Sequence, residues 1–353
     1  MKRFCFIGCL LVLFGISVCI VPVSGFAQGK TVTLRFSTFF PPSHKHAVVT
    51  EEWCKEVEKR TNGRVVAKHY PGATLTPANQ TYDSVAQGVV DVGNIVLGYT
   101  MGKFPLSEVL DYPLGYPSGT VATHLANEYY KKFKPKEFDD VKIMYFHAQT
   151  PGILHTRKPV NKLEDLKGMK IRTFGSNADF MKLLGGVPVA MTMGEAYDAI
   201  NKGVADGLLC AYEALEGWKL GEVVKYDIEN FGSSYTATFV VAMNKKKWAS
   251  ISPADQKIIE QINQEWIEKQ AKVWDDIDES GKQYSLKRGN KVIKLSPQED
   301  ERWAKQAVPL YAKYLESMKQ KGLPGDQVLK FARDYLAEAR KAASAKAPAA
   351  PKK

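Results

Sequence analysis

A pattern that occurs twice places the strongest constraint on how this chain can fold. Residues 81–92 read TYDSVAQGVVDV and residues 196–207 read AYDAINKGVADG, so Tyr-Asp, four further residues, Gly-Val, one residue and Asp recur in the same order. Each copy predicts a helix that ends at a left-handed glycine and a strand that begins at the Asp. We therefore expect two similarly built units, with the repeated residues as scaffold and the functional residues where the units face each other.

Two series of alternating strands and helices surround the copies. The order βαβαβ predicts α/β layers with parallel strands. Ser43 should open the first helix, Asn62 and Gly63 should close it, and Ser176 should be the N-cap of a helix in the second series. The expected strands cover residues 31–39, 64–70, 89–97, 141–148, 168–174, 187–191 and 204–210, and the expected helices cover residues 43–63, 78–88, 119–133, 176–186 and 193–203.

The last third of the chain predicts elements that join the two units. Residues 234–244 read as a strand that returns between the units, and residues 252–281 as a long helix opened by Ser252 and Pro253. Apolar residues recur at three- and four-residue spacing along this helix, which indicates one packing face that could cross both units. The low-complexity end, residues 341–353, is expected to be disordered.

The N-terminus has the pattern of a secretory signal sequence. Lys2 and Arg3 precede an apolar run, and small residues before Ala27 offer a cleavage site. We expect residues 1–27 to be removed and the mature protein to be soluble. A lipoprotein anchor is an alternative, but Cys9 comes too early for it and Cys19 lacks a small residue before it.

Cysteine usage and charge exclude several classes of protein. The mature chain would keep only Cys54 and Cys210, without CxxC spacing, so neither a disulfide framework nor a zinc site is predicted. The formal net charge is +11, of which Lys2 and Arg3 supply two and four lysines of the tail supply four, which leaves five for the folded body. Lys and Arg alternate with Asp and Glu in the predicted helices, so we expect no nucleic-acid partner.

No set of catalytic residues emerges from the motifs. The chain has neither a GxSxG nor an HExxH motif, and residues 98–104, GYTMGKF, are too short for a phosphate loop and lack its Ser or Thr. The six histidines are scattered, and paired carboxylates such as Asp139 and Asp140 lie in solvated stretches. We therefore expect a protein that is not an enzyme, without metal or cofactor.

Arg172 stands out because of its position. It lies at the C-terminal end of the predicted strand 168–174, where open α/β sheets bind ligands, and just before a helix whose N-terminus favours an anion. A guanidinium group can grip a carboxylate with two parallel hydrogen bonds. The alternative is a surface arginine paired with a nearby carboxylate such as Asp179.

Three motifs together resemble a known family. Residues 162–172 (KLEDLKGMKIR), 184–188 (LGGVP) and 195–207 (EAYDAINKGVADG) look like the DctP-type substrate-binding proteins of TRAP transporters, and the resemblance covers nearly the whole mature chain. It implies a periplasmic, two-lobed protein that closes on a small organic acid and hands it to the small and large membrane permease subunits. It also implies that Arg172 clamps the ligand carboxylate.

At other positions the sequence departs from the family members that bind sugar acids. A second arginine of many members falls on Gly152, an asparagine that often follows Asp-Gly falls on Cys210, and charged groups of the first lobe are replaced by Val96, Leu97 and Tyr99. These departures favour a monocarboxylate with an apolar or aromatic body over a polyhydroxylated ligand. The expected ligand-binding residues are Arg172, Phe174, Phe39, Tyr99, Cys210, Tyr212, Tyr235, Val96 and Gly152, with Phe40 as a further wall.

The resemblance implies an α/β, two-lobed periplasmic-binding-protein fold with a hinge and a long C-terminal helix that spans both lobes. We expect residues 28–150 and about 239–283 to form lobe I, and residues 151–238 and about 284–340 to form lobe II. Hinge closure around the acid would then create the state that the permease recognises, with a monomer as the working unit. Two rival functions remain open, a sensory module that presents the acid to a receptor and an exported enzyme on the same scaffold.

Overall fold

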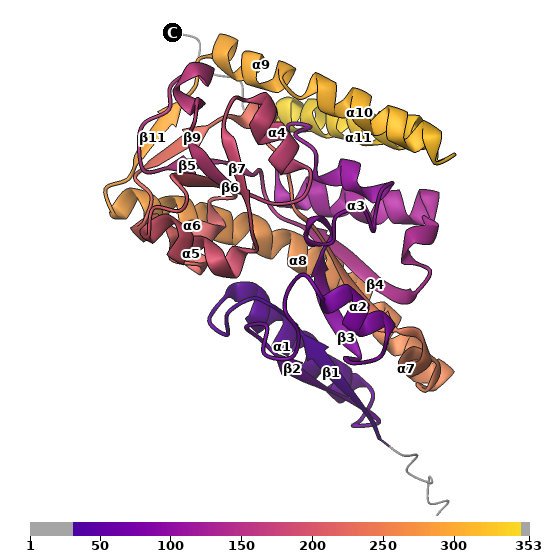
Figure 1. Cartoon of the computed structure of the whole chain (residues 1–353). Helices are drawn as coiled ribbons and strands as arrows, with labels where there is room; N and C mark the ends of the chain where they lie inside the picture. Colours follow the sequence, from indigo (N-terminus) through magenta and orange to yellow (C-terminus); the bar gives the residue numbers. More distant parts are fainter. Residues whose placement is uncertain (1–30, 347–353) are drawn as a thin grey trace, which may run out of the picture.

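The computed structural model describes residues 31–346 and arranges them as two β-sheets with helices around each (Figure 1). The expected signal sequence, residues 1–27, lies outside this range. None of the helices formed by residues 31–346 is long and apolar enough to cross a membrane. The mixed α/β architecture with two sheets confirms the fold class expected from the sequence.

The first sheet has the strand order β2-β1-β3-β10-β4. Strand β1 pairs in parallel with β2 and β3, as the first βαβαβ series predicts, whereas β10 is antiparallel to both β3 and β4. The returning strand of the sequence prediction therefore inserts between β3 and β4. The strands are β1 (Val32–Ser37), β2 (Val65–Tyr70), β3 (Val92–Val96), β4 (Val141–Ala148) and β10 (Thr238–Asn244).

The second sheet has the strand order β11-β9-β5-β8-β6-β7. The predicted strands β6, β7 and β8 pair in parallel, and β5, β9 and β11 are strands that were not expected from the sequence. Strand β5 joins the two groups because it is antiparallel to β8 on one side and to β9 on the other. The strands are β5 (Ile153–Thr156), β6 (Lys170–Thr173), β7 (Val187–Ala190), β8 (Gly207–Cys210), β9 (Tyr226–Glu229) and β11 (Lys291–Lys294).

The repeated pattern makes the same connection in both units. The φ angles of Gly88 and Gly203 are +79° and +74°, so each ends its helix in the left-handed conformation. Asp91 Oδ2 then accepts the backbone N–H of Arg35 in β1 at 2.7 Å, and Asp206 Oδ2 accepts that of Lys170 in β6 at 2.9 Å. Each aspartate thus ties the strand after the helix to the neighbouring parallel strand, which confirms a scaffold role for the repeat.

Helices surround both sheets, with two local differences from the sequence prediction. The first unit comprises the first sheet with α1 (Lys45–Arg60), α2 (Thr81–Ala86) and α3 (Gly119–Phe133); the second unit comprises the second sheet with α4 (Asn177–Leu183), α5 (Met193–Asn201) and α6 (Glu213–Gly217). The N-cap of α1 is His44 and not Ser43, because the His44 side chain accepts the N–H of His46. Ser176 precedes α4 in helical conformation and forms no side-chain capping bond.

Helix α8 (Pro253–Lys287) contacts both units (Figure 1). Its carboxylate Asp275 accepts the N–H groups of Gly119 and Thr120 at the start of α3, and its Ser285 donates to Asp227 of β9 at 2.6 Å. The helix is longer than the predicted span 252–281. Its apolar stripe is confirmed by the buried side chains of Ile259, Ile262, Trp266, Val273 and Trp274.

Two chain segments run between the sheets beside α8. Residues 149–152 lead from β4 to β5, and residues 235–237 lead back towards β10. Gly152 and Tyr235 form an antiparallel bridge, and the N–H of Gln149 donates to the carbonyl of Ala237 at 3.1 Å. These antiparallel segments are where a hinge of the predicted kind would lie.

The C-terminal helices contact both units. The short α7 (Lys245–Ala249) precedes α8, and three further helices, α9 (Pro297–Lys305), α10 (Val308–Gln320) and α11 (Gly325–Lys346), follow β11 on the far side from α1 (Figure 1). Helix α11 packs on α3, and α9 packs on the turn after β9. The expected disordered tail is wrong for residues 341–346, which continue α11 because Ala and Lys favour a helix. Residues 347–353 lie outside the described range.

Candidate functional site

Arg172 lies at the end of β6 with its side chain fully buried between the two units. Its Nε and Nη2 atoms donate to the carbonyl of Met191 at 3.2 and 2.9 Å, and Nη2 also donates to the hydroxyl of Tyr99 at 3.3 Å. Tyr99 belongs to the first unit and also accepts the N–H of Met193 at 3.0 Å. The guanidinium group is therefore fixed in direction by contacts from both units.

The third nitrogen of Arg172, Nη1, is buried and forms no hydrogen bond with any residue between 31 and 346. The surface-pair alternative is wrong, because Asp179 pairs with Lys182 and Lys313 instead. A buried charge without a counter-ion is costly by several kcal/mol, on the order of the penalty for breaking a buried ion pair. The site is thus chemically suited to an anion that approaches Nη1.

Aromatic rings surround Phe174, the residue that follows β6. The centre of its ring lies 5.4 Å from Arg172 Cζ and 5.5 Å from the ring of Tyr99, and Tyr235 approaches its ring edge-on at 5.8 Å. Backbone segments of the two units also meet here, because the Cα of Gly98 lies 3.0 Å from the position that a Cβ would take at Gly175. The expected residues Arg172, Phe174, Tyr99 and Tyr235 therefore form one cluster.

Phe39 extends this cluster towards the surface. Its ring stacks on Phe40 at 4.4 Å and on Trp218 of the second unit at 5.9 Å, and it meets Tyr99 edge-on at 5.9 Å. Phe239 of β10 is parallel to Phe39 and lies opposite Val96 in the sheet register. The result is an apolar wall that both units build.

Gly152 packs against the ring of Tyr235. A Cβ atom at this position would lie 2.1 Å from Cε1 of Tyr235, so only glycine allows the tyrosine ring to lie on the backbone. Tyr235 thus fills the space in which a longer side chain at position 152 would lie. Its hydroxyl is buried and lies beside the side-chain amide of Gln149.

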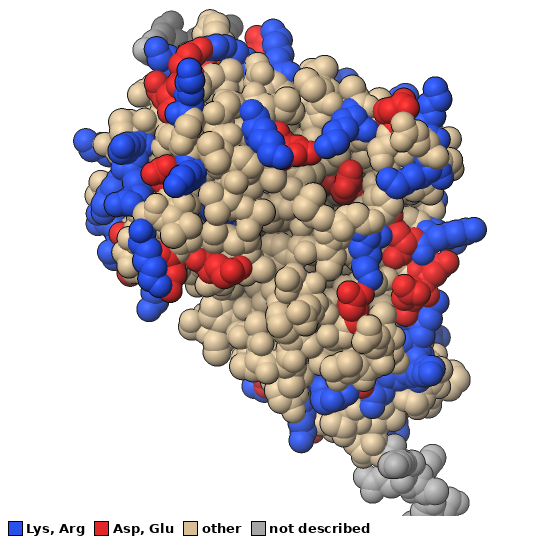
Figure 2. Space-filling model, viewed as in Figure 1, with Lys and Arg blue, Asp and Glu red and all other residues tan. Residues whose placement is uncertain are grey.

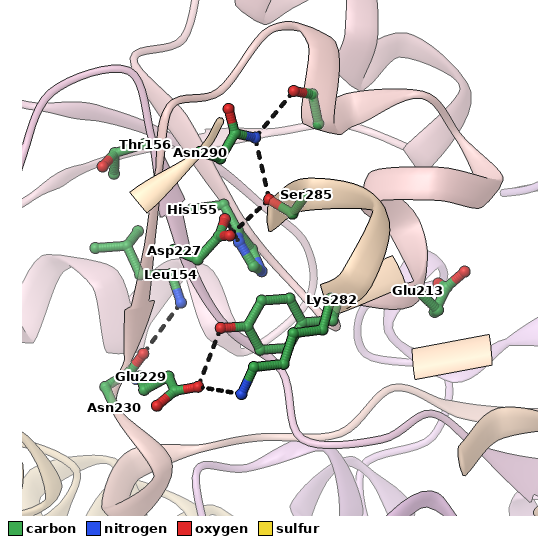
Figure 3. Close-up of polar contacts among 12 residues, drawn as sticks. Leu154, His155, Thr156, Glu213, Asp227, Glu229, Asn230, Lys282, Ser285 and Asn290 are labelled. Carbon is green, nitrogen blue, oxygen red and sulfur yellow. Dashed lines mark hydrogen bonds and ion pairs between the residues drawn. The ribbon is translucent and has the colours of Figure 1, made fainter. Parts of the chain in front are cut away.

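Cys210 contacts His155, the first of a line of buried polar groups on the second sheet; Figure 3 shows this line from His155 onwards. His155 Nδ1 donates to Asp227 Oδ1 at 2.8 Å, and Ser285 and Asn290 continue the line beyond Asp227. Burial lowers the pKa of His155, but Cys210 and Asp227 outweigh this effect and raise it. Burial also raises the pKa of the Cys210 thiol, so this cysteine is a poor nucleophile despite the nearby histidine.

Tyr212 is held by neighbours within the second unit. Its hydroxyl donates to Glu229 at 3.2 Å, and Lys282 of α8 reaches the same carboxylate at 2.7 Å (Figure 3). Its ring packs edge-on against His155. Tyr212 therefore has surroundings that differ from those of the Phe174 cluster, whereas Cys210 lies within electrostatic reach of Arg172 and Tyr235. Within residues 31–346, no group of three or more His, Cys, Asp and Glu side chains could hold a metal ion.

A groove of about 530 Å³ leads from the surface to Phe39. The band across the middle of this face carries mostly uncharged residues (Figure 2). A larger groove of about 610 Å³ runs along β4 between α3 and α8 and shares no residue with the cluster around Arg172. Residues from both units line the first groove: Phe39, Pro41, Pro42, Gly72, Ala73, Pro77, Ala78 and Asn79 from the first, and Thr192, Gly194, Glu195 and Trp218 from the second.

Sequence reasoning missed three residues of the cluster. Gln149 directly follows the predicted strand 141–148, so the strand-end position that pointed to Arg172 could also have pointed to Gln149. Phe239 lies in the interior of the predicted strand 234–244, and an apolar residue at such a position is expected to pack in the core. Trp218 carried no signal, because only the contact between the two units brings it to Phe39.

The chain is similar to known proteins over most of its length. A model of the family described as bacterial extracellular solute-binding protein, family 7, matches residues 36–317. A TRAP solute-binding protein from Rhodoferax ferrireducens, solved with copurified benzoate, is 30% identical, with a TM-score of 0.83 over 89% of this chain and 100% of the other.

Two further solved structures are similar over 87% of this chain. A marine-metagenome TRAP solute-binding protein specific for aromatic acids, with 3-hydroxybenzoate, is 27% identical with a TM-score of 0.82 and 98% of its own chain covered. A TRAP solute-binding protein from Bordetella bronchiseptica, with both enantiomers of mandelate, is 29% identical with a TM-score of 0.80 and 99% covered.

Proposed function

The chain belongs to the bacterial extracellular solute-binding protein family 7 and is a solute receptor of the TRAP-transporter type, and we propose that its ligand is an aromatic monocarboxylate anchored by Arg172. The observation that carries the proposal is the fully buried guanidinium of Arg172, whose Nη1 has no partner among residues 31–346 and which lies beside the ring of Phe174. A carboxylate on Nη1 would supply the missing counter-charge, and the surrounding rings would bury an apolar body.

Two properties of the cluster support an aromatic body. Burial of apolar surface contributes about 25 cal/mol per Å², and aromatic rings pack edge-on or offset with a further gain of about 0.5–1.5 kcal/mol per pair. Phe39, Tyr99, Phe174 and Trp218 offer such faces and edges from both units. The ligands of the three similar solved proteins, benzoate, 3-hydroxybenzoate and mandelate, are aromatic monocarboxylates.

In the proposed mechanism, the acid enters between the open units and binds Arg172 of the second unit. Tyr99 of the first unit then reaches the guanidinium group and the start of α5, as its hydrogen bonds to Arg172 and Met193 indicate. Closure buries the ligand, and the membrane subunits of the transporter recognise the closed form. The protein would act as a periplasmic monomer without catalysis. A sensory module remains the second candidate, since presentation to a receptor would use the same closure.

Replacement of Arg172 by alanine tests the anchor. Loss of the guanidinium would leave the ligand carboxylate buried and unpaired, so we expect Arg172→Ala to weaken binding by about 2–5 kcal/mol. Isothermal titration calorimetry on residues 28–353 with benzoate, 3-hydroxybenzoate and mandelate measures this directly. Arg157→Ala is the matched control, because Arg157 is exposed. Equal affinity of wild type and Arg172→Ala for every acid that binds would contradict the proposal.

A further inference from the structure

The groove of about 530 Å³ begins one residue away from the carboxylate anchor. The carbonyl of Met191 accepts a hydrogen bond from Arg172, and the next residue, Thr192, lines the groove. On the other side of Thr192 along the chain, the N–H of Met193 donates to the hydroxyl of Tyr99. The segment that holds the guanidinium group therefore continues directly into the second-unit wall of the groove.

Phe39 connects the groove with the aromatic cluster from the side of the first unit. Its ring meets Tyr99 edge-on at 5.9 Å, and it lies nearly parallel to Trp218, with 17° between the ring planes. Phe39 and Trp218 both line the groove, so each unit contributes one aromatic ring to it. Such faces and edges are favourable packing partners for a further ring. The groove is thus an apolar extension of the site around Arg172.

The lining of the groove is suited to an uncharged group. Among the described residues that line it, Glu195 carries the one charged side chain, and its carboxylate accepts the N–H and the hydroxyl of Thr192 at 2.9 and 2.7 Å. A second anionic group on the ligand would therefore meet a carboxylate and no cation. The volume lies within the range of about 300–1,000 Å³ that is usual for small-molecule sites.

The first-unit wall of the groove is rigid. Its residues Pro41, Pro42 and Pro77 each have a φ angle that the pyrrolidine ring fixes. Ala73 has a φ angle of +58°, a left-handed conformation that is unfavourable for a residue with a Cβ atom. Its N–H donates to the carbonyl of Thr38 at 2.9 Å, which holds this turn against the end of β1. A strained and tethered turn in the wall indicates a shape that is built for binding.

We propose that the groove binds the distal, apolar part of the acid, so that the preferred ligand is an arylalkanoate, in which methylene groups separate the ring from the carboxylate. This inference rests on the proposed function, because Arg172 must hold the carboxylate. The ring of such an acid would pack against Phe39 and Trp218. Benzoate carries its ring directly on the carboxylate carbon, so its ring would stay beside Arg172 and leave the groove unused.

Calorimetry with benzoate, phenylacetate, 3-phenylpropionate and 4-phenylbutyrate tests whether the groove takes part in binding. Each methylene group that moves apolar surface out of water should raise the affinity of wild type by up to about fourfold, equivalent to about 0.8 kcal/mol. Ordering of the chain offsets part of this gain, so 4-phenylbutyrate should bind at least about tenfold more tightly than benzoate. Equal or tighter binding of benzoate by wild type overturns the inference.

Two variants fill the groove from opposite walls. A Cβ atom at Gly194 would meet no atom within 4 Å, so Gly194→Phe can place a ring in the groove without a clash. Asn79→Phe does the same from an exposed position of the first unit. Each should reduce the preference for 4-phenylbutyrate over benzoate at least about fivefold. Val204→Phe adds the same ring at an exposed position outside the groove and should leave the preference unchanged.

The equilibrium affinities also separate this role from that of an entry path. If the groove were only the route by which acids enter, the two groove-filling variants would slow association and dissociation alike, and the preference would stay as in wild type. An unchanged preference in both variants therefore overturns the inference. Failure of the proposed function looks different, since no acid would then bind wild type, or Arg172→Ala would bind every acid as tightly as wild type does.

Discussion

Asp111 is a buried carboxyl group whose two oxygens have unequal surroundings. Oδ1 accepts the N–H of Thr238 at 2.8 Å, and Oδ2 has no hydrogen-bond partner within residues 31–346. Burial raises the pKa of Asp111 to about 7, against the smaller opposing effect of Thr238. The folded state therefore binds a proton more tightly than the unfolded chain does. The stability that this proton contributes is complete below about pH 4 and is lost as the pH rises through 7.

Replacement of Asp111 by asparagine should remove this pH dependence. Between pH 4 and pH 8, the free energy of unfolding of Asp111→Asn should rise relative to wild type by up to about 4 kcal/mol, because each pKa unit corresponds to about 1.4 kcal/mol. Urea denaturation at both pH values measures the difference. Asp198→Asn, at an exposed position, is the control and should show almost none. A difference for Asp111→Asn that does not change with pH would be contrary to this account.

At the scale of elements, the two copies of the repeat differ in how strongly they are held. Asp91 is buried, and besides the N–H of Arg35 it contacts the side chains of Arg35 and Lys247. Asp206 is more exposed and accepts one backbone N–H. We therefore expect Asp91 to contribute more than Asp206 to the free energy of unfolding.

Alanine substitutions measure this inequality. Asp206→Ala should lower the free energy of unfolding by about 1 kcal/mol, as for one lost hydrogen bond, and Asp91→Ala by about 2–3 kcal/mol, because it also removes the ion pairs with Arg35 and Lys247. Chemical denaturation of both variants is the measurement, and Asp198→Ala in the second copy serves as an exposed control. A larger loss from Asp206→Ala would show that the extra contacts of Asp91 add nothing.

The elements also show why part of the fold could be predicted from the sequence. The glycine ends of α2 and α5, the long apolar stripe of α8 and the strand that carries Arg172 follow from local sequence patterns, whereas the N-caps expected at Ser43 and Ser176 did not. Strands β5 and β9 escaped prediction because each has four residues and carries a polar group, His155 or Asp227, into the core. Those two groups satisfy each other across the sheet, and Phe39 meets Trp218 across the units. Local patterns contain no information on such partners.

At the scale of the whole molecule, a contact away from the ligand cluster joins the two units. Nε2 of His44, at the start of α1, donates to Oε2 of Glu213 in α6 at 3.0 Å, and both side chains are buried. Nδ1 of the same ring accepts the N–H of His46 and so caps α1. This bond forms only when the units are together, so it should favour the closed form.

His44→Asn separates the two roles of this histidine. Asparagine is a good N-cap but is too short to reach Glu213, so α1 should remain capped while the contact between the units is lost. We expect ligand affinity to fall about 5- to 30-fold, equivalent to about 1–2 kcal/mol of closed-state stability, although position 44 is not part of the ligand cluster. Calorimetry measures the affinity, with His124→Asn, a surface histidine paired with Glu268, as the control. If His44→Asn bound the ligand as tightly as wild type, the bond between His44 and Glu213 would not stabilise the closed form.

The contact between Gly152 and Tyr235 has a consequence for how ligand preference can change during evolution. A side chain at position 152 is barred while the tyrosine ring lies on it, and a small residue at position 235 would leave an empty space beside Phe174. Each single substitution is thus harmful, whereas the two together exchange one way of filling the pocket for another. Specificity at this end of the pocket should therefore diverge in paired steps, and the two positions form an epistatic unit.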